Sequence, residues 1–255
     1  MSSSMTKRIT RGLLMASLMT AVAVSADVEE TFEKTYPLAA DGRIRLENVN
    51  GDIRIEAWDR NEVAVKYVKS GDNQDELDRV DVTIDADNDS LSIETEYKKR
   101  KSSWHHGNSG SVDFSLKVPA NARLNNVSSV NGSLDIRGVT GGIDSSTVNG
   151  RIEVRDVAAD LDLETVNGTI EAWFSNLGGD QRISLETVNG RIIVWLPEGA
   201  DVAIDAETVH GGISNDFGLE VDKGFVGRDL NGKLGSGNAR LDLETVNGSI
   251  KIKKS

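Results

Sequence analysis

The chain contains no cysteine, and only three prolines and three histidines occur among its 255 residues. The absence of cysteine excludes disulfide bonds, and it also excludes lipid attachment through a cysteine that follows a signal peptide. Stability must then come from apolar burial and from backbone hydrogen bonds. Because proline is scarce while short runs of Val, Ile and Thr are frequent, the composition favours an all-β chain over a disordered one.

Several enzyme signatures are also missing. The sequence has no G-x-S-x-G elbow, phosphate-binding loop, H-E-x-x-H motif or dinucleotide fingerprint. Its formal net charge of -12 repels nucleic acids and anionic lipids. We therefore predict a protein that is not an enzyme, with no cofactor and no nucleic-acid partner. A glycan-active lyase or hydrolase of the β-helix type is the alternative, since such enzymes use carboxylates on the face of a coil.

Long apolar runs are absent except near the N-terminus. There, Lys7, Arg8 and Arg11 precede an apolar run over residues 13–24, and the small residues Ser25 and Ala26 follow it. This order predicts an export signal over residues 1–26. The run is shorter than the roughly 20 apolar residues of a membrane-spanning helix. We expect an exported protein without membrane insertion after removal of the signal. The periplasm is the expected location, and secretion or the cell surface are the alternatives.

What the sequence does contain is one repeated phrase, Val-Asn-Gly, which once becomes Val-His-Gly. From the second copy onward the phrase recurs about every 20 residues, with a degraded Leu230-Asn231-Gly232 between the last two copies. Such a period indicates a chain built by stacking one small unit. A repeat array offers a long regular surface, whereas catalysis needs a few unique residues that converge in a pocket. The seven copies are centred on Asn50, Asn131, Asn149, Asn167, Asn189, His210 and Asn247.

Each copy has apolar residues on both sides. Apolar and polar residues alternate after the glycine, as at Ile152 and Val154, which predicts a strand with one buried face. Before the asparagine, apolar residues stand at positions minus six and minus four, and we place the valine at minus one on the same inward side. This spacing requires a bend or bulge at the intervening Glu-Thr pair. One repeat is then two short strands joined by a corner.

Two all-β architectures account for this pattern. Asn-Gly between alternating runs is typical of a type I′ hairpin, and hence of a hairpin meander. A parallel coil explains in addition why the same residue recurs, because equivalent side chains lie about 4.8 Å apart and asparagines can then form a ladder. Glycine would take a left-handed corner conformation. We favour a right-handed parallel β-solenoid, with ladder residues Asn131, Asn149, Asn167, Asn189, His210 and Asn247.

The organisation along the chain follows from the repeats. Residues 27–125 hold the first copy and several strands without the motif, so we predict an irregular β region that caps the stack. Residues 126–255 form the repeat solenoid. The last strand carries Lys251, Lys253 and Lys254, which would protect it if it were a free sheet edge.

Two outward columns are candidate sites. Position five after the glycine carries Arg137, Arg155, Trp173 and Trp195 on successive repeats. Stacked side by side, they would form a strip of cations and aromatic rings suited to sugars or to a protein partner. Alternatively, each tryptophan packs beneath a neighbouring loop.

The second column carries glutamate three positions before the motif's Asn, at Glu164, Glu186 and Glu207 on successive repeats. Such like charges are unfavourable unless they splay, pair with bases or hold a cation. We interpret them as a solvated column, with calcium binding as the alternative. The pair His105 and His106 has no acidic neighbour within several positions and is interpreted as loop, so no metal site is predicted.

The sequence resembles a known group. Ile-Glu-Ala-Trp-Asp after Gly51, Leu-Lys-Val-Pro at residues 116–119 and the serial Thr-Val-Asn-Gly-x-Ile units resemble the putative-adhesin family of bacterial β-strand-repeat proteins, a domain of unknown function. The resemblance implies a right-handed β-helix-like fold, a place in or outside the bacterial envelope, and no catalytic residues.

The function that follows is a non-enzymatic, adhesin-like binding or scaffolding module whose partner is an envelope glycan or an envelope protein. Because some members of the family are associated with envelope-stress signalling, a sensor component with a protein partner is a further alternative.

Overall fold

The computed structural model describes residues 28–98, 110–224 and 227–255. The predicted signal over residues 1–26 and the pair His105–His106 lie outside these ranges. Within them, strands dominate, and the one helix is α1 (Gln74–Leu77). The all-β prediction is confirmed. No described helix has the length and apolar character needed to span a bilayer.

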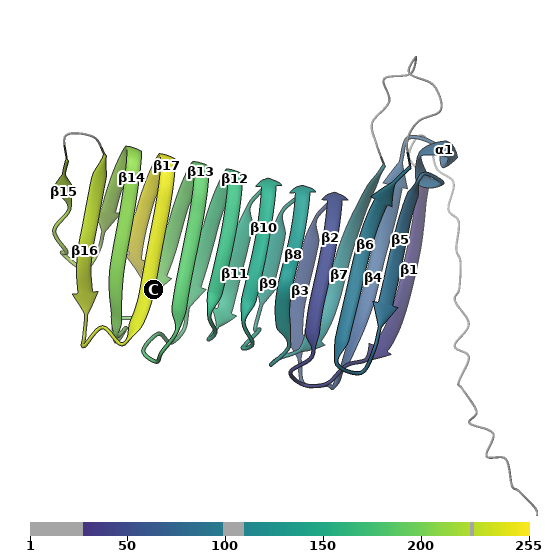
Figure 1. Ribbon diagram of the computed structural model, residues 1–255, viewed down its shortest axis with the longest axis horizontal. Coiled ribbons are helices and arrows are strands. Elements are labelled where there is room, and N and C mark those ends of the chain that lie inside the picture. Colours follow the sequence, from purple (N-terminus) through teal and green to yellow (C-terminus); the bar gives the residue numbers. More distant parts are fainter. Residues whose placement is uncertain (1–27, 99–109, 225–226) are drawn as a thin grey trace, which may run out of the picture.

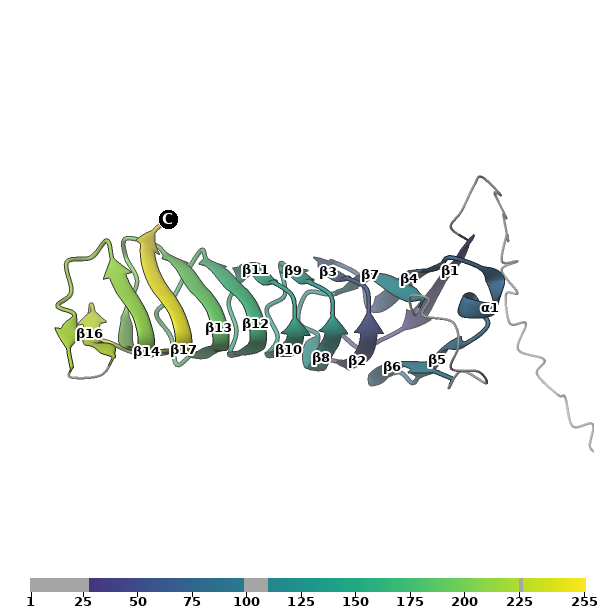
Figure 2. The same cartoon turned by 90° about the horizontal axis from the view of Figure 1, so that it is seen from above.

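The described strands join into one 17-stranded sheet that wraps around a core (Figures 1 and 2). They are β1 (Val28–Pro37), β2 (Arg43–Asn50), β3 (Ile53–Trp58), β4 (Glu62–Gly71), β5 (Val80–Ala86), β6 (Ser90–Tyr97), β7 (Ser111–Pro119), β8 (Arg123–Asn131), β9 (Leu134–Arg137), β10 (Ile143–Asn149), β11 (Ile152–Val157), β12 (Leu161–Phe174), β13 (Arg182–Leu196), β14 (Val202–Asn215), β15 (Asp222–Lys223), β16 (Arg228–Leu234) and β17 (Ala239–Lys254).

Each repeat forms one coil with two layers. The segment before Asn-Gly lies in the layer of β8 and β10, and the segment after it lies in the layer of β9 and β11 (Figure 2). Neighbouring repeats pair in parallel and in register, with Leu161 opposite Ile183 and Asn167 opposite Asn189. In β12, β13, β14 and β17 one strand runs through the whole motif, so these three Asn-Gly pairs and the His-Gly pair of β14 do not form hairpin turns.

Antiparallel pairs occur toward the two ends of the stack, so the sheet as a whole is mixed. At one end β4 pairs with β1 and β7, and β5 pairs with β6. At the other end β16 pairs with β14 and β15. These pairs cap the parallel coils at both ends. The hand of the winding stays a prediction.

The coils are not stacked in the order of the sequence. Strand β2 lies between β6 and β8, although β6 follows it along the chain. At the other end, β17 lies between β13 and β14 (Figure 1). The expectation that the last strand is a free edge is therefore wrong, because β17 forms backbone pairs on both of its sides.

One core runs through the whole stack. It begins at Leu38, includes Phe114 at the N-terminal end and Phe174 in the middle, and ends at Ile252. The regions before and after residue 125 thus share a single cluster of buried apolar side chains. The division into residues 27–125 and 126–255 stays a prediction.

The valine before each asparagine points outward, so the prediction of an inward valine is wrong. In β12 the burial alternates strictly from Leu161 to Val166, and the alternation breaks after the valine rather than at the Glu-Thr pair. The inward residue is the threonine, since Thr147 Oγ1 donates to the carbonyl oxygen of Gly132 at 3.0 Å. This hydrogen bond offsets the cost of burying a hydroxyl. The exposed valines are Val130, Val148, Val166, Val188, Val209 and Val246.

The motif glycines are needed for close backbone approach. A Cβ on Gly168 would lie 1.8 Å from the carbonyl oxygen of Gly150, a separation that no side chain can occupy. Only Gly51 of the motif glycines has a positive φ, at 117°. The predicted left-handed corner is therefore wrong for the other copies.

Candidate functional site

The asparagines of the motif form a continuous side-chain ladder. Asn131 Nδ2 donates to Asn50 Oδ1 at 2.9 Å, and four further bonds of 2.9–3.0 Å continue it in the same direction. His210 lies opposite Asn247 at the end of the row. In stacking order the row is Asn50, Asn131, Asn149, Asn167, Asn189, Asn247 and His210.

A groove runs beside this ladder, across the strands. Its volume is about 690 Å³, and it is lined by the three residues that precede the asparagine in six consecutive coils. The valines form one wall, with 39–43% of each valine exposed. Buried Ser129 and the motif threonines form the floor. The opposite wall consists of Ser128, Ser146, Glu164, Glu186, Glu244 and Glu207 in stacking order. We call this feature the Val–Glu groove.

Four of these wall residues are glutamates in unbroken succession, because insertion of β17 places Glu244 between Glu186 and Glu207. Partial burial, reinforced by Asp162, Glu186 and Asp144, raises the pKa of Glu164. Partial burial, reinforced by Glu186, Glu207 and two aspartates, likewise raises the pKa of Glu244. Within the described residues none of the four glutamates forms an ion pair. The row is thus a line of uncompensated negative charge.

The two ends of the groove differ. At the end beyond Glu207, Gly227, Arg228 and Asp229 of the β16 segment contribute to the lining, and Arg228 pairs with Thr208 in the antiparallel ladder. Toward the other end the wall residues are the neutral Ser128 and Ser146, followed by Asn48. The groove therefore has an acidic half and a neutral half.

The predicted Arg-Trp strip lies in the other layer of the coils. Trp173 and Trp195 stack with ring centroids 4.0 Å apart and an interplanar angle of 6°. The guanidinium of Arg155 lies 3.9 Å from the Trp173 ring, and Lys253 Nζ lies 5.3 Å from the Trp195 ring. Such contacts stabilise the column by cation–π attraction. Both outer faces of the tryptophan pair are covered by these cations, so a ligand would meet ring edges.

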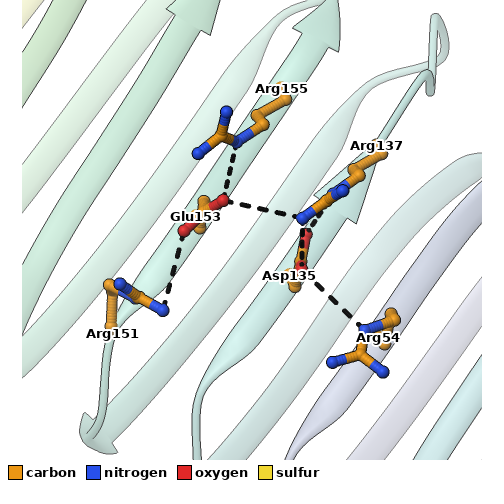
Figure 3. A network of polar contacts seen from close by, with 6 residues as sticks. All are labelled: Arg54, Asp135, Arg137, Arg151, Glu153 and Arg155. Atoms are coloured by element: carbon orange, nitrogen blue, oxygen red, sulfur yellow. Dashed lines mark hydrogen bonds and ion pairs between the residues drawn. The ribbon is translucent and has the colours of Figure 1, made fainter.

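The arginines of this strip are bound into a network of ion pairs (Figure 3). Arg137 donates two hydrogen bonds of 2.9 Å to Asp135, and this contact raises the pKa of its guanidinium. Arg155 donates to Glu153 at 2.6 Å. Three longer ion pairs complete the network. Asp135 pairs with Arg54 at 3.8 Å. Glu153 pairs with Arg151 at 3.7 Å and with Arg137 at 3.8 Å. The charged groups here satisfy one another, in contrast to the glutamate row.

The structure thus brings together the residues of each predicted column. The Arg-Trp strip is occupied by contacts among its own residues, whereas the glutamate column lines an open groove. Sequence reasoning missed the valines as surface residues because it assigned them to the core by their apolar nature alone. The strict period of two from Leu161 to Val166, counted one residue further, would have placed Val166 beside Glu164 on the outside. Within the described ranges no group of three or more His, Cys, Asp or Glu is arranged to hold a metal ion.

Comparison with solved structures finds proteins that resemble this chain. Among solved structures, a putative cell adhesion protein from Clostridium sporogenes is 14% identical with a TM-score of 0.52, covering 88% of this chain and 100% of that chain. A putative adhesin from Bacteroides fragilis is 12% identical with a TM-score of 0.38, covering 87% and 96%. A putative lipid binding protein from Parabacteroides distasonis is 13% identical with a TM-score of 0.32, covering 88% and 96%.

At these identities the likeness concerns the fold alone. No protein with a curated description matches the chain. The family comparison is more specific, since it selects the part of the chain that carries the regular repeats. Residues 142–253 match the family model described as Toastrack DUF4097, which confirms the resemblance to a family of unknown function.

Proposed function

We propose that the protein is a non-enzymatic binding module of the bacterial envelope, built as a right-handed β-solenoid, which holds a partner in the Val–Glu groove. The observation that carries this proposal is the groove itself, a continuous surface of about 690 Å³ to which six coils each contribute three residues. Its volume lies within the range of ligand-binding clefts.

The exposed valine wall supports an interaction surface. Exposed apolar rows are uncommon on soluble proteins unless they bind something. Threonine shares the β-branched shape of valine and its preference for strands, and at these six positions it would expose less apolar surface. Repetition of valine on six adjacent coils therefore favours selection for contact with a partner.

The uniformity of the lining supports binding rather than catalysis. An active site concentrates different groups with different protonation states around one reacting atom. The groove instead repeats Glu-Thr-Val in four coils and serine-containing equivalents in two, and its described lining contains no histidine, lysine or aromatic side chain. The place in the envelope rests on the predicted export signal. The description of the Clostridium sporogenes protein as a cell adhesion protein agrees with a binding role.

The test is a pull-down from bacterial envelope extract with three forms of the purified protein. The first is the unmodified protein, the second carries Val166→Asp with Val188→Asp, and the third carries Trp173→Ala with Trp195→Ala. We expect the unmodified protein and the tryptophan variant to retain the same partner, and the groove variant to lose it. Loss with the tryptophan variant alone would move the binding site to the Arg-Trp strip, and capture by all three forms would refute the groove.

A second candidate function is a glycan hydrolase on the same face. It is favoured by neighbouring carboxylates about 4.8 Å apart, near the separation used by retaining glycosidases, together with the raised pKa of Glu164 and Glu244. Incubation with envelope polysaccharides and assay of new reducing ends tests it. Turnover that disappears in Glu244→Gln would replace the binding proposal with this one.

A further inference from the structure

The chemistry of the Val–Glu groove specifies the kind of partner. Its described lining carries five carboxylates and a single cation, Arg228 at one end. The apolar wall stands opposite the acidic wall along the whole acidic half. A partner that fits must therefore present cations on one side and apolar side chains on the other.

An extended peptide segment has this shape. In an extended chain, successive side chains point to opposite sides and alternate residues lie about 6.7 Å apart. Four coils at about 4.8 Å spacing place the four glutamates over about 14 Å. Three alternate cations of an extended segment span about 13 Å, so they match the glutamate row, while the intervening residues face the valines.

The threonine hydroxyls of the groove floor are buried. Thr187 and Thr245 are buried, line the groove between Glu and Val, and their hydroxyl oxygens have no hydrogen-bond partner within the described residues. The equivalent Thr147 and Thr208 donate to glycine carbonyl oxygens at 3.0 and 3.2 Å. Since the hydroxyl oxygens of Thr187 and Thr245 are themselves shielded from solvent, recognition of a partner rests on the acidic and apolar walls.

The structure assigns the groove to an extended, basic protein segment in which cationic and apolar residues alternate, with the cations over Glu164, Glu186, Glu244 and Glu207. Neutral residues of the segment lie over Ser128 and Ser146. This inference rests on the proposed function, because it names the partner class of that site. The neutral half gives the segment a direction, since reversing it would place its cations beside serine.

The experiment measures binding of a fluorescently labelled synthetic peptide by anisotropy. The peptide carries three lysines alternating with valines, followed by Ser-Val, with both ends blocked. Control peptides replace the lysines by glutamates or the valines by serines. We expect binding of the basic peptide alone, weakened at high salt because the acidic wall is open to solvent. Equal binding of the acidic peptide would overturn the inference.

Variants locate the site. Glu186→Gln with Glu244→Gln should lower the affinity for the basic peptide about fivefold, as expected for the loss of two partly exposed ion pairs. Val166→Ala with Val188→Ala should lower the same affinity about threefold, because apolar contact is lost. Glu33→Gln with Glu94→Gln removes the same charge from exposed positions outside the groove and should leave the affinity unchanged. A circular dichroism spectrum and a melting curve for each variant verify folding.

Two further outcomes are decisive. If peptide binding needs calcium and disappears with a chelator, the glutamate row is a cation site and the inference is wrong. If the envelope pull-down depends on the groove but no basic peptide binds, the proposed function stands and the partner class is wrong. If the pull-down does not depend on the groove, the proposed function itself fails.

Discussion

Gly248 lies so close to Gly211 that a Cβ added at Gly211 would be 1.5 Å from the Gly248 carbonyl oxygen. The next residue, Gly212, has no heavy atom within 4 Å of the same added atom. A side chain therefore does not fit at Gly211, whereas the adjacent Gly212 has space for one. The contact sets how closely the backbones of two coils meet at the motif.

Gly211→Ala should destabilise the protein strongly, because the clash involves backbone that cannot turn away. We expect a loss of about 3 kcal/mol and a fall in Tm of about 6–12 °C. Gly212→Ala is the matched control and should be neutral or slightly stabilising, since it removes backbone freedom from the unfolded chain. Differential scanning calorimetry of both variants measures the contrast, and equal Tm values would contradict the close approach.

Asn189→Ala should weaken the asparagine ladder. The amide of Asn189 donates to Asn167 at 3.0 Å and accepts from Asn247 at 2.9 Å. Because the ladder is exposed, two lost bonds should cost about 1 kcal/mol in total, at the low end for hydrogen bonds. Urea unfolding measures the change, with Asn176→Ala in an exposed loop as the control. Asn189→Asp should be no better, since it keeps the acceptor but places a carboxylate against the Asn167 oxygen.

The glutamate row should make stability depend on pH. The pKa values of Glu164 and Glu244 are raised in the folded protein above the unfolded value of about 4.3. Folding therefore favours the protonated form, so this contribution is fully present below the unfolded pKa and is lost as pH rises through the folded pKa. At neutral pH, Glu244→Gln should raise Tm by about 2 °C.

The gain from Glu244→Gln should disappear in acid, where the wild-type carboxyl is already protonated. Glu33→Gln, at an exposed position on β1, should show no comparable gain. Melting curves of the three proteins across the acidic range test this prediction. A gain that persists below the unfolded pKa would show that the effect of the substitution is not electrostatic.

Trp173 and Trp195 should be energetically coupled. Their stacked rings at 4.0 Å predict an interaction of about 1 kcal/mol beyond the sum of separate burials. A double-mutant cycle with alanine at both positions measures this interaction directly. Trp58, whose indole nitrogen donates to the carbonyl oxygen of Glu62, lies on β3 and provides the control pair with Trp195. Similar coupling in both cycles would count against a specific contact of the two stacked rings.

Strand β17 should exchange its amide hydrogens slowly. It pairs with β13 and β14 along most of its length, so its opening requires the loss of two ladders. Hydrogen–deuterium exchange should show residues 241–252 protected as well as those of β12. The short strand β15, whose one partner among the described strands is β16, should exchange quickly. Fast exchange in β17 would contradict its place inside the stack.

Local features were predictable because they depend on neighbouring residues in the chain. Alternation after each glycine identified buried positions such as Ile170, and the recurrence of asparagine indicated a stacked row. The error at Val166 arose because Thr165 and Val166 compete for the inward position, and hydrophobicity alone does not decide which of them is buried. A threonine whose hydroxyl binds a glycine carbonyl of the next coil can be buried at little cost, and the strand then turns the valine outward.

By itself, the sequence determined the all-β class, the repeating unit and the residues that each coil presents on a given column, since these follow from a period of two and a repeat of about 20 residues. Only the tertiary structure decided which coils are neighbours. Every repeat offers a similar edge, so nothing local tells β17 to enter between β13 and β14. That long-range choice joins Glu244 to the glutamate row and places Lys253 over Trp195, because both contacts depend on backbone pairing between coils distant in the chain.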